Sequence, residues 1–470
     1  MTLRALSLIC LLGSLAQAQL PSVQWESQRA ELLRHYRSLI QIDTTSPPGN
    51  ETRAVEYLKK VFDAEGIPTK TFAVDPSRAN LVARIKGNGS KRPILLMAHT
   101  DVVSVQREKW PVDPFGAVMK DGYVWGRGSA DDKDIVASNL MIMLLLKRSG
   151  VTLDRDVIFL AEAGEEGDSQ FGAKFMAEQH FDEIDAEFAL TEAGGAVIRG
   201  GKVAIVEIET AEKVPHPIRL VANGVSGHAS RPRVDNAVAH LAGAVAKVAA
   251  WQTPMRLNDT TRTYFEKLAT VSSPEDAARY KNLTRPDRTE AVQKYLAEND
   301  PFRYSMLRTS VVPTIIKGGY RTNVIPSEAE ATLDIRALPD EDMPKFFAEM
   351  TRIINDPAVK FAETDFGARP TTAPSRLDSE MYLALERSAK RIYPQATVIP
   401  MMQTGATDMA YLRAKGVQSY GIGPGQTEND YTNFGAHSDV ERLPESSLYS
   451  FAEFTWNAVA DLVSGKSAGR

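Results

Sequence analysis

Histidine and carboxylate side chains follow short apolar runs at several places in this sequence. His99, Asp101, Glu165, Glu166 and Glu192 each come at the end of such a run or within a few residues of it. Short apolar runs bounded by turn residues are typical of strands buried in a sheet, and open α/β sheets build their sites at the carboxyl ends of strands. The sequence therefore indicates metal or acid–base chemistry at strand ends.

The segment His99-Thr100-Asp101 is the first of these places. Residues two apart on a strand point to the same face, so His99 and Asp101 can meet. A metal-bound imidazole needs an acceptor for its second ring nitrogen, and a carboxylate commonly supplies it. The alternative is an ordinary surface hydrogen bond between the two side chains.

Two further acidic segments and a late histidine extend the pattern. Asp131 and Asp132 follow a glycine-containing segment and begin a long apolar stretch, where acidic residues can also serve only to cap a helix. Glu165 and Glu166 are adjacent and point in different directions, so one can bind a metal while the other acts as a general base; a solvated loop is the alternative. His437 stands alone in a glycine-containing loop.

Taken together, the types and order of these residues indicate a single site. Histidine, aspartate, paired glutamates, a further glutamate and a distant histidine together supply five oxygen or nitrogen ligands and one base. That is the inventory of a two-metal site with a bridging carboxylate.

Composition narrows the alternatives. The 470 residues are 43% hydrophobic and 24% charged, which is typical of a soluble globular protein, and the length predicts more than one domain. A net charge of -5 without a basic run gives no footprint for nucleic acid or an anionic membrane. The single cysteine, Cys10, lies in the N-terminal segment discussed next. If that segment is removed, the remaining chain has no cysteine, which excludes disulfides, a cysteine nucleophile and thiolate metal ligands.

The N-terminus has the pattern of a secretory signal. Arg4 precedes an apolar run over residues 5–12, and a small-residue cleavage site follows at residues 16–18. A buried N-terminal helix is the alternative, and the run is too short to span a bilayer. We expect cleavage near Ala18 and export to the periplasm or the medium.

The remaining chain reads as an α/β protein with an insertion. Apolar runs at residues 80–85, 93–98 and 157–161 predict buried strands, and residues 135–148 predict a helix packed on the sheet. The pattern of apolar runs changes near residue 214, which predicts the start of an inserted domain. Within it, a charge-rich segment at residues 257–300 predicts helices. The expected division is a signal peptide at 1–18, a catalytic domain at 19–213 and 372–470, and an inserted α+β lid domain at 214–371.

With these motifs in place, the chain resembles the acetylornithine deacetylase, succinyl-diaminopimelate desuccinylase, aminoacylase and glutamate carboxypeptidase family of di-zinc metallopeptidases. The resemblance implies a catalytic domain with a mixed central sheet and a lid of the dimerisation type. It implies that Asp131 bridges two zinc ions. The implied ligand pairs are His99 with Glu192 on one zinc, and Glu166 with His437 on the other. Asp101 would orient His99, and Glu165 would be the general base on a water that bridges the metals.

The inserted segment matches the family's lid motifs at three positions. The resemblance implies that His228 helps to stabilise the oxyanion, from the partner subunit in dimeric members, that Asn323 lies near the substrate, and that Arg336 holds a substrate carboxylate. A guanidinium suits that task because its fork donates two parallel hydrogen bonds. Asp132 matches a position of unusual peptide geometry. Asp134 departs from the family, which more often has glycine there.

The predicted activity is hydrolysis of a peptide or amide bond next to a free carboxylate, as in a carboxypeptidase or dipeptidase. Deacylation of an N-acyl amino acid on the same scaffold is the first alternative, and a non-catalytic exported binding protein is a second. Cobalt or manganese can replace zinc, because affinity order does not decide the metal in a carboxylate-rich site. A homodimer through the lid is the expected assembly.

Overall fold

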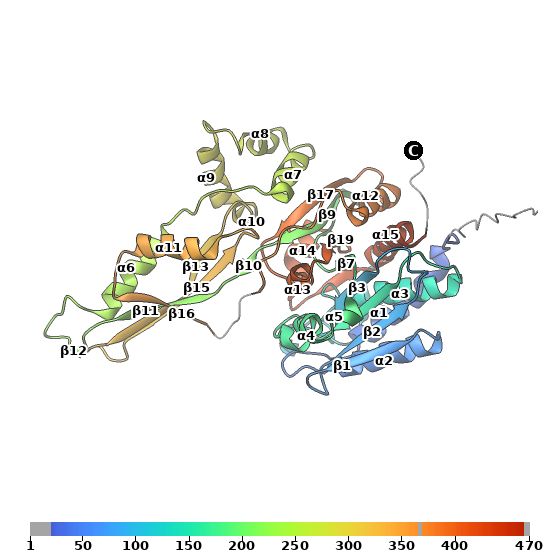
Figure 1. Ribbon diagram of the computed structural model, residues 1–470, viewed down its shortest axis with the longest axis horizontal. Helices are drawn as coiled ribbons and strands as arrows, with labels where there is room; N and C mark the ends of the chain where they lie inside the picture. The colour runs from blue at the N-terminus through green and yellow to red at the C-terminus, as the bar shows by residue number, and fades with distance from the viewer. Residues whose placement is uncertain (1–19, 365–368, 465–470) are drawn as a thin grey trace, which may run out of the picture.

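The computed structural model describes residues 20–364 and 369–464. The predicted signal peptide at residues 1–18 lies outside the described residues. The chain forms a larger lobe around a ten-stranded sheet and an elongated smaller lobe around a five-stranded sheet (Figure 1). None of the helices within the described ranges is long and apolar enough to cross a membrane.

The large sheet is mixed, with a parallel centre. Its strands run in the order β1 (Thr69–Ala73), β2 (Ala79–Ile85), β6 (Val157–Glu162), β3 (Ile94–His99), β7 (Phe188–Thr191), β18 (Gln418–Gly421), β9 (Lys202–Glu212), β8 (Gly195–Arg199) and β19 (Gly425–Thr427), with β17 (Thr397–Gln403) beside β9. Neighbours from β6 to β18 in this order are parallel, whereas β1, β2 and β6 pair antiparallel. Three neighbouring parallel strands, β6, β3 and β7, therefore end at the same edge.

Helices cover both faces of this sheet, which explains the uninterrupted apolar runs. Successive residues of β3 and β6 point alternately into two separate buried clusters. One face packs against α1 (Trp25–Ile40), α2 (Thr52–Ala64), α3 (Lys133–Ser149), α12 (Glu380–Ile392) and α15 (Glu445–Val463), and the other against α4 (Ala173–Gln179), α5 (Phe181–Ile184) and α13 (Met409–Ala414).

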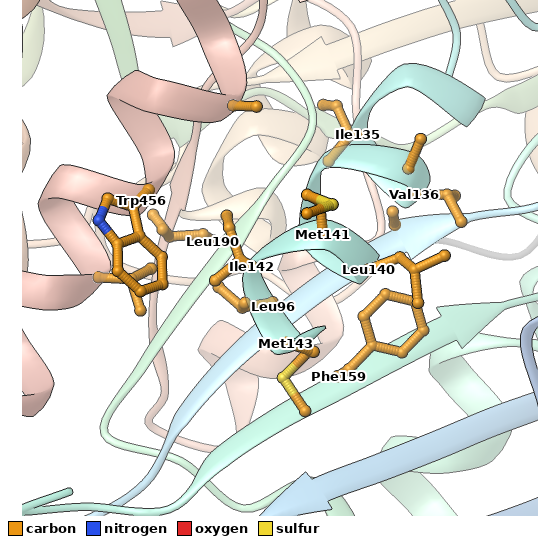
Figure 2. Packing of buried hydrophobic residues seen from close by; sticks show 14 of the residues in the cluster. Leu96, Ile135, Val136, Leu140, Met141, Ile142, Met143, Phe159, Leu190 and Trp456 are labelled. Carbon is orange, nitrogen blue, oxygen red and sulfur yellow. The ribbon is translucent and has the colours of Figure 1, made fainter. Parts of the chain in front are cut away.

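Helix α3 lies at the centre of the first cluster. Leu96 and Phe159 from the sheet and Trp456 from α15 lie around Leu140 and Ile142 of α3 (Figure 2). Burying a leucine or phenylalanine side chain contributes about 1.5–3 kcal/mol relative to exposure. This packing fixes α3 and the acidic turn that precedes it relative to the strand ends.

The small sheet is antiparallel and covered on one face. Its strands are β10 (Val214–Pro215), β11 (Ile218–Asn223), β13 (Ser310–Gly318), β15 (Glu328–Ala337) and β16 (Val359–Glu363). Helices α6 (Ala237–Ala249) and α11 (Met343–Ile354) pack on it through an apolar cluster. A two-stranded ribbon of β12 (Gly227–His228) and β14 (Val324–Ile325) lies at the far end of this lobe (Figure 1). Together with the large mixed sheet, this confirms the predicted fold class.

The charge-rich segment is helical and packs on the larger lobe. It forms α7 (Asp259–Leu268), α8 (Pro274–Asn282), α9 (Thr289–Asn299) and α10 (Pro301–Ser305). Tyr264 and Phe265 of α7 are buried with Ile399 and Met401 of β17. These helices therefore cover a strand of the large sheet, although they lie within the sequence of the insertion.

Short elements complete the fold. They are β4 (Val118–Lys120), β5 (Tyr123–Trp125) and β20 (Arg442–Pro444), which form a small sheet, the 3₁₀ turns at Arg107–Lys109 and Ser169–Phe171, and helix α14 (Glu428–Phe434).

Candidate metal centre

The ends of three neighbouring strands bring most of the predicted ligands together. His99 is the last residue of β3, Glu165 and Glu166 lie in the turn after β6, and Glu192 directly follows β7. Because the three strands are parallel neighbours, their carboxyl ends meet at one edge of the large sheet. The prediction that these side chains lie at strand ends matches the observed geometry.

Asp131 lies between the two histidines. Its Oδ1 is 2.9 Å from Nε2 of His99, and its Oδ2 is 3.2 Å from Nε2 of His437. Glu166 Oε2 is 2.9 Å from Nε2 of His437, and Glu192 Oε2 is 3.7 Å from Nε2 of His99. Each histidine thus faces one carboxylate of its own and one oxygen of the shared Asp131, as two metal positions joined by a bridging carboxylate require.

Asp101 fixes both His99 and the glutamate turn. Nδ1 of His99 is 3.0 Å from the Asp101 carbonyl oxygen and 3.5 Å from its carboxylate, so the backbone is the nearer acceptor. The carboxylate accepts hydrogen bonds from the backbone N–H groups of Glu165 and Glu166, each at 3.1 Å. The completely buried Asp101 carboxylate therefore also sets the direction of the two glutamates.

The turn that carries Asp131 is held by a residue that the sequence did not single out. Glu441 accepts hydrogen bonds from the backbone N–H groups of Gly128 and Ala130 and pairs with Arg127 at 2.5 Å. Gly128 has φ +81°, and a Cβ there would lie 2.8 Å from Val102. The turn therefore requires glycine for both its conformation and its close packing.

The peptide bond between Asp131 and Asp132 is cis, and Asp132 is the residue immediately before α3, without a capping hydrogen bond from its side chain. The first turn of that helix is intact at Asp134, where the family more often has glycine. The Asp134 side chain is buried without a hydrogen-bond partner in the described part of the chain, and burial raises its pKa to about 8. Burial thus favours the neutral form of this carboxyl group.

The pKa values of the ligands at this site are shifted in the directions that a cluster of buried carboxylates and imidazoles produces. Burial raises the pKa of Glu192 well above its ordinary value and also raises that of Glu166. Hydrogen bonds to Asp131 and Glu166 raise the pKa of His437 to about 10. Burial opposes protonation of His99, but hydrogen bonds to Asp101 and Asp131 still raise its pKa well above the usual range.

The donor set fits two divalent cations. His99, Asp131 and Glu166 offer atoms within 4.8 Å of one another, and so do His99, Asp132 and Glu192. Asp132 accepts the backbone N–H of His99 at 3.2 Å, whereas Asp131 has one oxygen near each histidine. Imidazole and carboxylate ligands without sulfur suit zinc, and they also suit cobalt or manganese. The carboxylates around two imidazoles leave excess negative charge for the cations to balance.

The three predicted lid residues do not join this group within one chain. His228 is exposed in the β12–β14 ribbon, where its Nδ1 accepts from Ser230, and the backbone oxygen of Asn323 accepts from Ala229. Figure 1 shows this ribbon at the end of the smaller lobe farthest from β3. Arg336 lies on β15, where its Nε pairs with Asp334 at 2.8 Å.

A second ion pair near the site was also absent from the sequence prediction. Arg369 lies between Glu165, at 3.5 Å, and Asp408, at 3.0 Å. Burial, together with the charge of Asp408, raises the pKa of Glu165 to about 8. Arg369 is more than 200 positions from Glu165 in the sequence, and no local motif marks it.

Metal binding should release protons at pH 7. The metal-free His437 is protonated there because its pKa is about 10, whereas a metal binds the neutral ring. Metal affinity should therefore rise as the pH increases toward 10. Calorimetric zinc titrations in buffers of different ionisation enthalpy should show release of about one or more protons per chain. Binding without proton release would contradict this assignment of His437.

Comparisons with known proteins identify the family and the fold. The family model described as peptidase family M20/M25/M40 matches residues 95–460. The N-fatty-acyl-amino acid synthase/hydrolase of Homo sapiens is 28% identical over 84% of this chain and 80% of its own length. The M20 family metallo-carboxypeptidase of Sulfolobus solfataricus has a TM-score of 0.69 at 20% identity, covering 92% of this chain and 98% of that one. A dinuclear metal-binding M20 peptidase of Bacillus subtilis has a TM-score of 0.62 at 15% identity, covering 93% and 98%.

Proposed function

Because the chain belongs to peptidase family M20/M25/M40, and is thus an enzyme, we propose that it is a two-metal hydrolase that cleaves a peptide or amide bond next to a free carboxylate. The observation that carries this proposal is the position of Asp131, with one carboxylate oxygen facing each histidine. Glu165 lies next to Glu166 in the turn after β6. Zinc is the proposed metal at both positions.

The chain's own residues would divide the reaction between them. His99, Glu192, His437 and Glu166 would hold two cations with Asp131 as the bridge, and the cations when bound would polarise the scissile carbonyl and lower the pKa of the attacking water. The Glu165 carboxylate would take the proton from that water and pass it to the leaving amine. Its position beside the ligands, rather than among them, leaves it available for this transfer.

Arg336 would bind the substrate carboxylate. Its guanidinium is partly exposed and pairs with the Asp334 carboxylate, which a substrate carboxylate would replace or join. Arg336→Met should raise KM for free-carboxylate substrates by about tenfold, because one charge-assisted interaction of about 1.5 kcal/mol or more is lost. kcat should change little, and C-terminally amidated substrates should be poor for the wild type and insensitive to the substitution. Equal turnover of free and amidated substrates by the wild type would contradict the proposed specificity.

Deacylation of N-acyl amino acids is the second candidate, and the likeness to the human N-fatty-acyl-amino acid synthase/hydrolase favours it. The two activities share the metal centre and the carboxylate next to the scissile bond. A panel of dipeptides, amidated dipeptides and N-acyl amino acids distinguishes them. Preferential cleavage of dipeptides supports the peptidase, preferential cleavage of N-acyl amino acids supports the deacylase, and no turnover with two metals bound would contradict both.

We also propose that the protein is exported after cleavage near Ala18. Arg4, the apolar run and the small-residue site carry this proposal. Sequencing the N-terminus of protein from its native host should give a start near Gln19, and a start at Met1 or Thr2 would contradict export.

A homodimer through the smaller lobe is the proposed assembly. Strand β13 pairs only with β15 among the described strands, so it forms an edge, and Val312, Ile315 and Ile316 on it are 50–63% exposed. An exposed apolar edge is a template for pairing with another strand, and a second copy would also supply the distant His228.

A charged substitution on strand β13 tests whether this edge forms the dimer interface. Ile316→Lys should convert a dimer to a monomer in sedimentation experiments, because an ammonium group would be buried at the paired edge. Val74→Lys, on a residue of similar exposure in the larger lobe, is the matched control and should leave the dimer unchanged. A wild-type monomer, or an unaffected dimer in Ile316→Lys, would contradict this interface.

A further inference from the structure

The carboxylate of Glu165 has one cationic partner in the described part of the chain, and it comes from a distant segment. Nη2 of Arg369 is 3.5 Å from Oε1 of Glu165, with the Arg369 side chain 17% exposed and that of Glu165 12% exposed. No hydrogen bond to the Glu165 carboxylate is present in the same part of the chain. Its backbone N–H is fixed by Asp101, but its side chain depends on Arg369 for direction.

The guanidinium is itself held from a second side. Nη1 of Arg369 forms an ion pair with Oδ1 of Asp408 at 3.0 Å, without hydrogen-bond geometry, and the Asp408 side chain is completely buried at the start of α13. The neighbouring Thr407 donates both its N–H and its hydroxyl to Oε2 of Glu212 on β9. The aromatic ring of Tyr411 lies 5.9 Å from the guanidinium carbon. Contacts through Asp408 and the neighbouring Thr407 thus connect Arg369 to strand β9 of the large sheet.

The two contacts point opposite terminal nitrogens at opposite carboxylates. A planar fork whose one end is anchored presents its other end in a defined direction, which a flexible ammonium does not do. Each terminal nitrogen of Arg369 therefore has a carboxylate of the chain as its nearest charged partner. Its place in the segment that returns from the smaller lobe also connects that segment to the base.

We propose that Arg369 is a positioning residue that holds the Glu165 carboxylate in the orientation needed for proton transfer, with Asp408 as its anchor; this inference rests on the proposed role of Glu165. A misplaced reacting group costs up to about a hundredfold in rate. Arg369→Met should therefore lower kcat by about tenfold to a hundredfold and leave KM and the metal content nearly unchanged. Arg369→Lys should recover part of the rate, and so should added guanidinium ion with Arg369→Met.

A double substitution tests whether Arg369 acts through Glu165. In a Glu165→Gln background, Arg369→Met should cause no further loss, because residues that act as a unit are not additive. Arg376→Met is the matched control: Arg376 lies in the same returning segment but pairs with Asp378 at the surface, and its loss should leave kcat unchanged.

The outcomes separate this inference from the proposed function. If Glu165→Gln is inactive but Arg369→Met has the wild-type kcat, the positioning role is overturned and the function stands. A rise in KM at constant kcat would assign Arg369 to the substrate and also overturn it. Should the wild type turn over nothing, hydrogen exchange decides: residues 163–168 should exchange faster in Arg369→Met than in Arg376→Met, and equal exchange would overturn the contact.

Discussion

Glu165→Gln should lower kcat by about a hundredfold or more while two metals stay bound, because a general base commonly contributes about 10²–10⁴-fold. Glutamine keeps the size of the side chain and removes only its ability to accept a proton. The ligands are untouched, since the Glu165 side chain forms no ion pair with His99 or His437 in the described part of the chain; its ionic partner is Arg369. Steady-state kinetics with metal analysis on the same sample measures both effects.

Asp168→Asn is the matched control for this experiment. Asp168 lies three residues further along the same turn and caps the short 3₁₀ segment through Gln170. Its amide variant should keep the wild-type rate within a fewfold. A Glu165→Gln enzyme that is fully metallated and turns over at the wild-type rate would refute the assignment of the base.

Asp131→Ala should cause the second large effect, because it should lower both the metal content and the rate of turnover. One oxygen of Asp131 faces His99 and the other faces His437, so the substitution removes a ligand from both positions at once. Loss of a residue that only orients a ligand costs about 10–100-fold in metal affinity or activity, and loss of a shared ligand should cost more. Bound zinc should fall from about two per chain to below one, with turnover lost.

Glu192→Ala provides the comparison within the site. It removes the carboxylate that faces only His99, so one metal should remain near His437 and Glu166. Asp182→Ala, at an exposed position in α5, controls for loss of an aspartate elsewhere. If Asp131→Ala and Glu192→Ala lost metal equally, Asp131 would not be the bridge.

The parts of the fold that could be predicted are those whose burial is visible locally. Strands β3 and β6 are covered on both faces, so nearly every residue is apolar and the run itself marks a strand. Strand β9 gave no such signal. Glu207, Glu209 and Glu212 interrupt it, although the strand is largely buried and Arg413 lies within 4 Å of two of them.

The same distinction separates the site residues. Ligands that follow strand ends could be found because the sheet places neighbouring strand ends together. Arg369 and Glu441 act through contacts with residues more than 200 positions away, which no spacing reveals. The predicted lid residues show the opposite case: His228 and Asn323 match a motif, but their place at the far end of the smaller lobe follows from tertiary structure alone.

The most direct test of the account is the rate of hydrolysis as zinc is returned to the metal-free protein. The account predicts no turnover without metal, with the full rate at about two zinc ions per chain and a matching loss in Asp131→Ala. Full turnover by the metal-free protein, or saturation of the rate at a single zinc per chain, would contradict a two-metal hydrolase bridged by Asp131.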